Sequence, residues 1–152
     1  MKRFLIAVAL TFATTTAASA AAPLTVSGAW SRPAVAGTTG VGYMVIANTG
    51  KAPDALVRVE SPLAAKVEMH ASSMAGGVMR MRQEARVAVP PRGRAVFAPG
   101  GHHLMLIRLT KTLKAGDEIP VTLTFASGAK LRVAFAVGTG AAPPATGAMK
   151  HQ

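Results

Sequence analysis

The sequence predicts an all-β protein built as an antiparallel β-sandwich. Its apolar runs are short, and several alternate with polar residues in the two-residue period of half-buried strands. Gly, Pro, Asn and Ser residues separate these runs, and no long stretch keeps a helical period. About seven to nine short strands at this spacing are typical of a sandwich.

Each expected strand is an apolar or alternating run that ends at turn-forming residues. The clearest pair is a hairpin in which Ser127-Gly128 forms the turn between TLTFA and AKLRVAF. We expect Pro99-Gly100-Gly101, and in the same way Gly76-Gly77, to turn the chain sharply into the strand that follows. The expected strands lie near residues 24–31, 41–48, 55–60, 65–70, 78–83, 94–98, 103–109, 119–126 and 129–137.

The first twenty residues are typical of a secretory signal peptide. MKR is a charged segment, FLIAVALTFA an apolar one, and Ala18-Ser19-Ala20 a small-residue cleavage site. The apolar segment is shorter than the roughly 20 residues that a membrane span needs. We therefore expect residues 1–20 to be removed, residues 21–137 to form one domain, and residues 138–152, which lack a core pattern, to form a flexible tail.

The signal peptide predicts a periplasmic protein. The chain contains no cysteine, so neither a lipid anchor nor a disulfide is expected, and we expect a soluble monomer without a transmembrane segment. The net charge of +11 falls to +9 when Lys2 and Arg3 leave with the signal peptide. The basic residues are dispersed and carry no interleaved aromatics, so nucleic acid is not an expected partner. An anionic membrane surface, an acidic partner and a merely solvated basic surface stay open.

Two histidines and two methionines stand in a spacing that predicts a metal site, His70-x10-Met81-x21-His103-x-Met105. Thioether sulfur together with imidazole selects monovalent copper over zinc, calcium or magnesium. A methionine alone in an apolar strand is more often a packing residue, but the joint spacing favours ligands. Because His103 and Met105 are two residues apart, both should leave one face of their strand. The site is expected at an end or edge of the sandwich.

Several residues near these four can be interpreted either as packing or surface residues or as part of the metal site. His102 precedes the ligand pair and is interpreted as a neighbour or a substitute ligand. Met79 is expected to pack in the core or line the site, Met74 to lie in a loop, and Met44 to lie in the core. Glu68 shares a strand face with His70 and could contact its imidazole, although an exposed strand residue is the favoured interpretation.

Two further features are independent of the main pattern. Trp30, the only tryptophan, is interpreted as a packing anchor rather than a copper contact. In the tail, Met149 and His151 could form a second, weaker copper site, with an idle terminus as the equally favoured alternative.

The chain resembles the PCuAC family of periplasmic copper chaperones, whose motif is written H(M)-x10-M-x21-H-x-M. The resemblance implies a cupredoxin-like β-sandwich of the Greek-key type and copper ligands at His70, Met81, His103 and Met105, with Met69 beside the first of them. It also implies that the domain holds Cu(I) for delivery to an acceptor, often the dinuclear copper centre of cytochrome c oxidase. The matching segments are AWSRP (29–33), GYMVIANTG (42–50), DALV (54–57), GVMRMR (77–82), PGGHHLML (99–106) and LKAGDEIPVTLTF (113–125).

The residues favour binding and transfer over catalysis. A blue-copper electron carrier needs a cysteine thiolate, which this chain lacks. Zinc sites rely on Cys, His and carboxylate, and a hydrolase is not expected because Asp54, Asp117 and Glu118 lie in turn-like contexts. A copper chaperone is the main hypothesis. A copper-sequestering or resistance protein without a specific acceptor is the alternative, since the same site would serve both.

Overall fold

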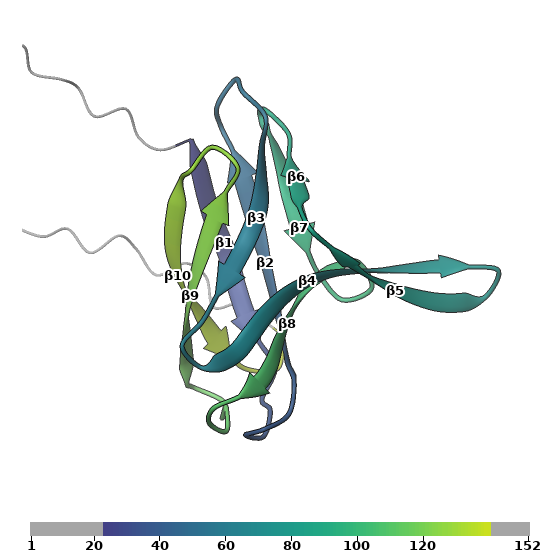
Figure 1. Cartoon of the computed structure of the whole chain (residues 1–152), viewed down its shortest axis with the longest axis vertical. Coiled ribbons are helices and arrows are strands. Elements are labelled where there is room, and N and C mark those ends of the chain that lie inside the picture. Colours follow the sequence, from purple (N-terminus) through teal and green to yellow (C-terminus); the bar gives the residue numbers. More distant parts are fainter. Residues whose placement is uncertain (1–22, 141–152) are drawn as a thin grey trace, which may run out of the picture.

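The computed structural model describes residues 23–140, and these form ten β-strands joined by turns and loops (Figure 1). None of the described residues belongs to a helix that could span a membrane. The signal peptide expected at residues 1–20 and the second copper site expected at Met149 and His151 lie outside the described residues. The strands are β1 (Leu24–Ser31), β2 (Gly40–Asn48), β3 (Asp54–Glu60), β4 (Ala64–Ala75), β5 (Val78–Glu84), β6 (Val87–Val89), β7 (Gly93–Phe97), β8 (His102–Leu109), β9 (Glu118–Phe125) and β10 (Lys130–Val137).

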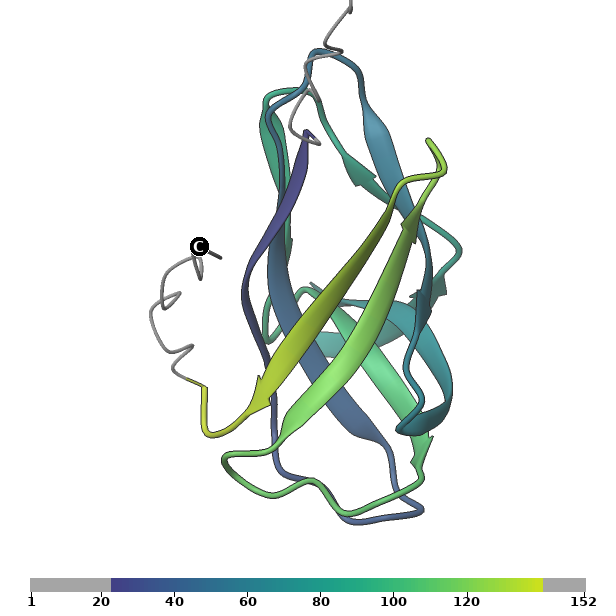
Figure 2. The ribbon, with the colours of Figure 1, turned by 90° about the vertical axis from the view of Figure 1, so that its left-hand side faces the viewer.

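The strands pair into one continuous sheet in the order β5-β4-β8-β7-β2-β1-β10-β9-β3-β6, and β8 also pairs with β2. The pairings are antiparallel except β1 with β10 and a single bridge between β7 and β8. Figure 2 shows β9 and β10 lying in front of β2 and β8, so the sheet folds back over itself in two layers. The prediction of an all-β, mostly antiparallel domain is confirmed.

One apolar core lies between the layers. Every second residue of β9 faces it, which is the burial pattern that the alternating sequence predicts. Met44 is 1% exposed, so its expected place in the core is confirmed. Phe135 closes the core against Gly42, where a Cβ atom would come within 3.1 Å of the phenyl ring. The largest fully buried side chains include Phe125, Phe135, Ile46, Leu56, Leu104, Leu106, Leu113, Ile119 and Leu123.

Strands β4 and β5 form a hairpin that extends away from the body of the domain (Figure 1). Gly76 and Gly77 form its two-residue turn, and both have positive φ, 58° and 77°, as a hairpin turn of the I′ type requires. Strand β8 accompanies β4 only as far as the pair Ala71 and His102. Strand β4 therefore runs beyond the expected residue 70, and its last residues pair with β5 alone.

A second turn leads the chain into β8. The amide of Gly101 donates to the Ala98 carbonyl at 3.0 Å, and the amide of Ala98 donates to the His102 carbonyl at 2.9 Å. Gly100 has a φ of 83°, a backbone conformation that residues with a Cβ atom rarely adopt. The predicted turn at residues 99–101 is thus present, and it places His102 and His103 at the start of the strand.

Candidate metal centre

Strands β4 and β8 bring the two histidines of the pattern together. His70 and His103 are direct cross-strand partners, and Glu68 is opposite Met105 one step further along. Partners in an antiparallel pair project from the same face, and residues two apart on a strand share that face. His70, His103 and Met105 therefore lie on one face of the sheet, and the ring centroids of the two imidazoles are 5.9 Å apart.

Strand β5 brings the fourth residue to the same face. Met81 is opposite Ser72, which is two residues beyond His70 on β4. Met81 and Met105 are thus diagonal neighbours of His70, on its two opposite sides. Diagonal neighbours across a strand pair are about 7–8 Å apart, with their Cβ atoms somewhat closer, a distance that long side chains can bridge. The register of three adjacent strands thus places all four predicted residues on one face of the sheet.

His103 is fixed by the turn that precedes it. His103 is only 5% exposed, and its Nδ1 atom is 3.0 Å from the carbonyl oxygen of Gly101. A carbonyl can only accept, so Nδ1 carries the proton and Nε2 presents a lone pair. That Nε2 atom is buried and has no hydrogen-bond partner.

His70 is fixed in the complementary tautomer. Its Nε2 atom is 2.9 Å from a carboxylate oxygen of Glu68, so Nε2 donates and Nδ1 keeps a lone pair. Nδ1 is also buried without a partner. Hydrogen bonds from Lys66 and His70 hold the pKa of the Glu68 carboxyl below its ordinary value, which keeps this acceptor ionised.

The contact with Glu68 corrects the favoured sequence interpretation. The side chain of Glu68 is only 14% exposed and lies between Lys66 and His70. It is therefore a partner of the imidazole rather than a solvated strand residue. Its position two residues before His70 was the signal, because the two-residue period puts both side chains on one face.

The two imidazole nitrogens without hydrogen-bond partners are free to coordinate a metal ion. Buried polar atoms without a partner are rare in proteins and call for an explanation. Histidines that bind metals usually donate their other ring N–H to a carboxylate or a backbone carbonyl, and both imidazoles do so here. Among residues 23–140, no three His, Cys, Asp or Glu side chains are grouped to hold an ion. By register, the soft donors next to the two imidazoles on this face are the thioethers of Met81 and Met105.

The two methionines differ in their surroundings. Met105 is half-buried on β8, next to Val41 of β2. Met81 is 55% exposed on the projecting hairpin. One thioether is therefore held by the body of the domain, while the other can move without disturbing the core.

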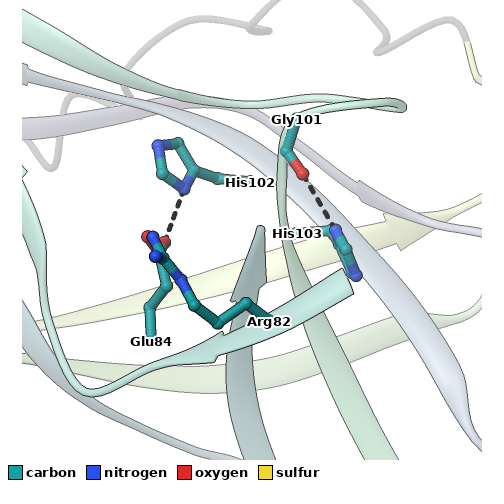
Figure 3. A network of polar contacts seen from close by, with 5 residues as sticks. All are labelled: Arg82, Glu84, Gly101, His102 and His103. Atoms are coloured by element: carbon teal, nitrogen blue, oxygen red, sulfur yellow. Dashed lines mark hydrogen bonds and ion pairs between the residues drawn. The ribbon is translucent and has the colours of Figure 1, made fainter. Parts of the chain in front are cut away.

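His102 and Met69 are not brought to this face. Figure 3 shows the imidazoles of His102 and His103 leaving β8 in opposite directions. His102 pairs with Glu84, Nδ1 to carboxylate oxygen 2.7 Å, and its ring lies 5.7 Å from that of Phe97. Met69, the direct partner of Leu104, is 6% exposed in the core. The interpretation of His102 as a neighbour agrees with this geometry, and its use as a substitute ligand does not.

Two methionine predictions are wrong. Met79 was expected in the core or lining the site; the core position is wrong, because the side chain is 61% exposed, and Met79 lies beyond Met81 toward the tip on the same face. Met74 was expected in a loop, yet it is the direct partner of Met79 on β4. Both errors have one cause, because the hairpin continues beyond β8 with no second layer against it. Trp30 packs on Tyr43, with ring centroids 4.8 Å apart, as a packing anchor should.

Removing the carboxylate beside His70 should weaken metal binding. In a Glu68→Ala variant the ring proton can move to Nδ1 and block the lone pair, so we expect cuprous ion affinity to fall about 10- to 100-fold. The matched control is Glu84→Ala, which removes the carboxylate beside His102 on the other face. Competition with a coloured cuprous chelator measures both variants. Equal losses in the two would contradict the assignment of Glu68.

Known proteins resemble this chain in sequence and in fold. The family model described as "Putative lipoprotein LpqE-like" matches residues 24–137. A protein of Leifsonia xyli subsp. xyli, named "Putative lipoprotein Lxx21020", is 35% identical over 74% of this chain and 68% of its own. The copper-bound PCuAC domain from PmoF2 matches with a TM-score of 0.64 and 26% identity, over 78% of this chain and 94% of that domain.

A second solved relative extends the comparison. The solution structure of CuI-DR1885 from Deinococcus radiodurans matches with a TM-score of 0.53 and 29% identity, over 70% of this chain and 75% of that one. The all-β domain described here thus has the PCuAC, cupredoxin-like fold. With a family match across nearly all the described residues, the chain belongs to the LpqE-like (PCuAC) family.

Proposed function

We propose that this protein binds one cuprous ion through Nδ1 of His70, Nε2 of His103 and the sulfur atoms of Met81 and Met105. The observation that carries the proposal is the pair of buried imidazole nitrogens that lack partners. Each is the lone-pair nitrogen of a ring whose other nitrogen donates to an oxygen. The solved relatives described as copper-bound and CuI-bound support the choice of metal.

The donor set suits Cu(I) in particular. All four donors are neutral, so the bound site carries a charge of one, and soft thioethers favour the monovalent ion. Zinc sites are built from Cys, His and carboxylate, and the carboxylate of Glu68 is already taken up by Lys66 and His70. The protein would bind and release the ion without making or breaking covalent bonds of a substrate.

Release to an acceptor is the second part of the proposal. Met81 is the exposed ligand and lies on the projecting hairpin, so an incoming donor can replace its sulfur first. The acceptor proposed from the resemblance is a copper-requiring protein such as cytochrome c oxidase, which would receive the ion at its dinuclear copper centre. Sequestration without a specific acceptor is the alternative, and the exposed position of Met81 favours transfer.

We further propose that residues 1–20 direct export and are removed, so that residues 21–137 act as a monomeric copper-binding domain in the periplasm. The charged, apolar and small-residue segments at residues 1–20 support export. Thioether and imidazole donors suit an oxidising compartment, because they bind copper without the risk of disulfide formation.

X-ray absorption on the copper-loaded protein tests the ligand set. We expect a cuprous edge and a first shell with both nitrogen and sulfur scatterers, in equal numbers. Loss of the sulfur shell in a Met81→Leu/Met105→Leu variant would assign it to these two residues. A parent spectrum with nitrogen and oxygen donors alone would contradict the proposal.

A further inference from the structure

Three methionines on the projecting hairpin are exposed to an extent that packing does not explain. Met74, Met79 and Met81 are 65%, 61% and 55% exposed. Methionine normally fills gaps in cores, and the other methionines whose burial is described are buried or half-buried. Met81 is accounted for by the proposed copper site. Met74 and Met79 have no part in that site or in the core.

The register puts the three thioethers on one face. Met74 and Met79 are direct partners next to the closing pair of the hairpin, and Met81 is two residues further along β5. Pairs that alternate with the hydrogen-bonded closing pair bring their Cα atoms to about 4.5 Å. Methionine has three rotatable side-chain bonds, so three sulfur atoms at these positions can converge on one ion.

This face is also the one that carries the histidine pair. From the tip of the hairpin inward, successive rows hold Met74 with Met79, Ser72 with Met81, and His70 with His103. On this face the three rows hold sulfur and imidazole donors together with the hydroxyl of Ser72 and the carboxamide of Gln83, which is opposite His70 on β5. Met81 lies in the middle row, within reach of both ends.

The charges near the tip lie on the opposite face. Arg80 and Arg82 alternate with the methionines along β5, so they project to the other side of the hairpin. No carboxylate lies on the methionine face between the tip and His70. A hard divalent cation has no anionic oxygen to bind there, whereas Cu(I) is the ion that neutral thioethers select.

We propose that Met74 and Met79 form a second, weaker cuprous site, which Met81 completes while the histidine site is empty, and through which the ion reaches the histidine site. The entry role rests on the proposed function of that site. In the transfer step the Cu–S bonds to Met74 and Met79 break, bonds to the imidazole nitrogens of His70 and His103 and to the sulfur of Met105 form, and the bond to Met81 is kept. Copper stays monovalent throughout, and no proton leaves, because both imidazole nitrogens already present lone pairs.

A cuprous titration of mature protein (residues 21–152) labelled with carbon-13 in the methionine methyl groups tests the second site. We expect the first equivalent to move the Met81 and Met105 signals, and a further equivalent to move those of Met74 and Met79. A Met74→Leu/Met79→Leu variant should keep the first, tight equivalent, lose the second, and load from a weak cuprous donor at least several-fold more slowly. Val78→Leu is the matched control, since Val78 is 58% exposed at the same tip.

The outcomes separate the two proposals. If the double variant binds a second equivalent as the parent does, the second site is overturned and the histidine site stands. If the parent binds no tight equivalent but copper still moves the Met74 and Met79 signals, the tip site stands and the proposed function falls. If these signals move only when an acceptor protein is added, the tip is a protein contact, and the metal site is overturned.

Discussion

A His103→Ala variant should bind cuprous ion at least about 100-fold more weakly than the parent, because loss of a direct ligand exceeds the 10- to 100-fold cost of losing a ligand's hydrogen-bond partner. In the parent protein the Nε2 atom of His103 is buried and has no hydrogen-bond partner, and the hydrogen bond from Nδ1 to the Gly101 carbonyl fixes the orientation of the ring. The adjacent His102→Ala variant should bind as the parent does, because His102 faces Glu84 on the other side of β8.

His102 and His103 are adjacent residues of the same type, so the two variants are matched controls for each other. Both variants remove one imidazole from the same strand, so their effects on chelator competition can be compared directly. Near-ultraviolet circular dichroism would confirm that both remain folded. Weaker binding in His102→Ala than in His103→Ala would contradict the proposed orientation of β8 and the histidine ligand with it.

A Met44→Ala variant should lower the free energy of unfolding by about 2–5 kcal/mol, as expected when a buried methionine is truncated in a core. Met44 is 1% exposed on β2 and packs among the strands of both layers. The matched Met79→Ala change on the exposed hairpin should alter the same free energy by no more than about 0.5 kcal/mol.

Urea unfolding followed by the fluorescence of Trp30 measures both variants. Trp30 packs on Tyr43 within the β1–β2 pair, so its emission reports on the body of the domain. A large loss in Met79→Ala would mean that the hairpin packs against another part of the protein. A negligible loss in Met44→Ala would contradict the described core.

The sequence predicts the strands well because alternation and turn residues are local signals. Gly76-Gly77 and residues 99–101 form turns where expected, and nine of the strands fall at the expected runs. The tenth, β6, is only three residues long and lies between turn residues, so it presents too little pattern to be recognised. Strand β4 was expected to end near residue 70, since nothing local shows that it continues as a free hairpin.

The candidate site is predictable only in part. The two-residue period places His103 with Met105, and Glu68 with His70, on common faces. That His70 is opposite His103 depends on the register of β4 against β8, which is set by long-range packing. The exposure of Met79 was missed for a related reason, because MRMR alternates like a half-buried strand whether or not a second layer covers it.

The central claim is that two imidazoles and two thioethers hold one cuprous ion, and a single titration tests it most directly. Mature protein, residues 21–152, competes under reductant with a coloured cuprous chelator, beside the Met81→Leu/Met105→Leu variant. We predict one tightly bound equivalent in the parent and at least about 100-fold weaker binding in the variant, because two direct ligands are lost there and losing even a ligand's hydrogen-bond partner costs 10- to 100-fold. Equal competition by the two proteins would contradict a role for the methionines and, with it, the proposed copper site.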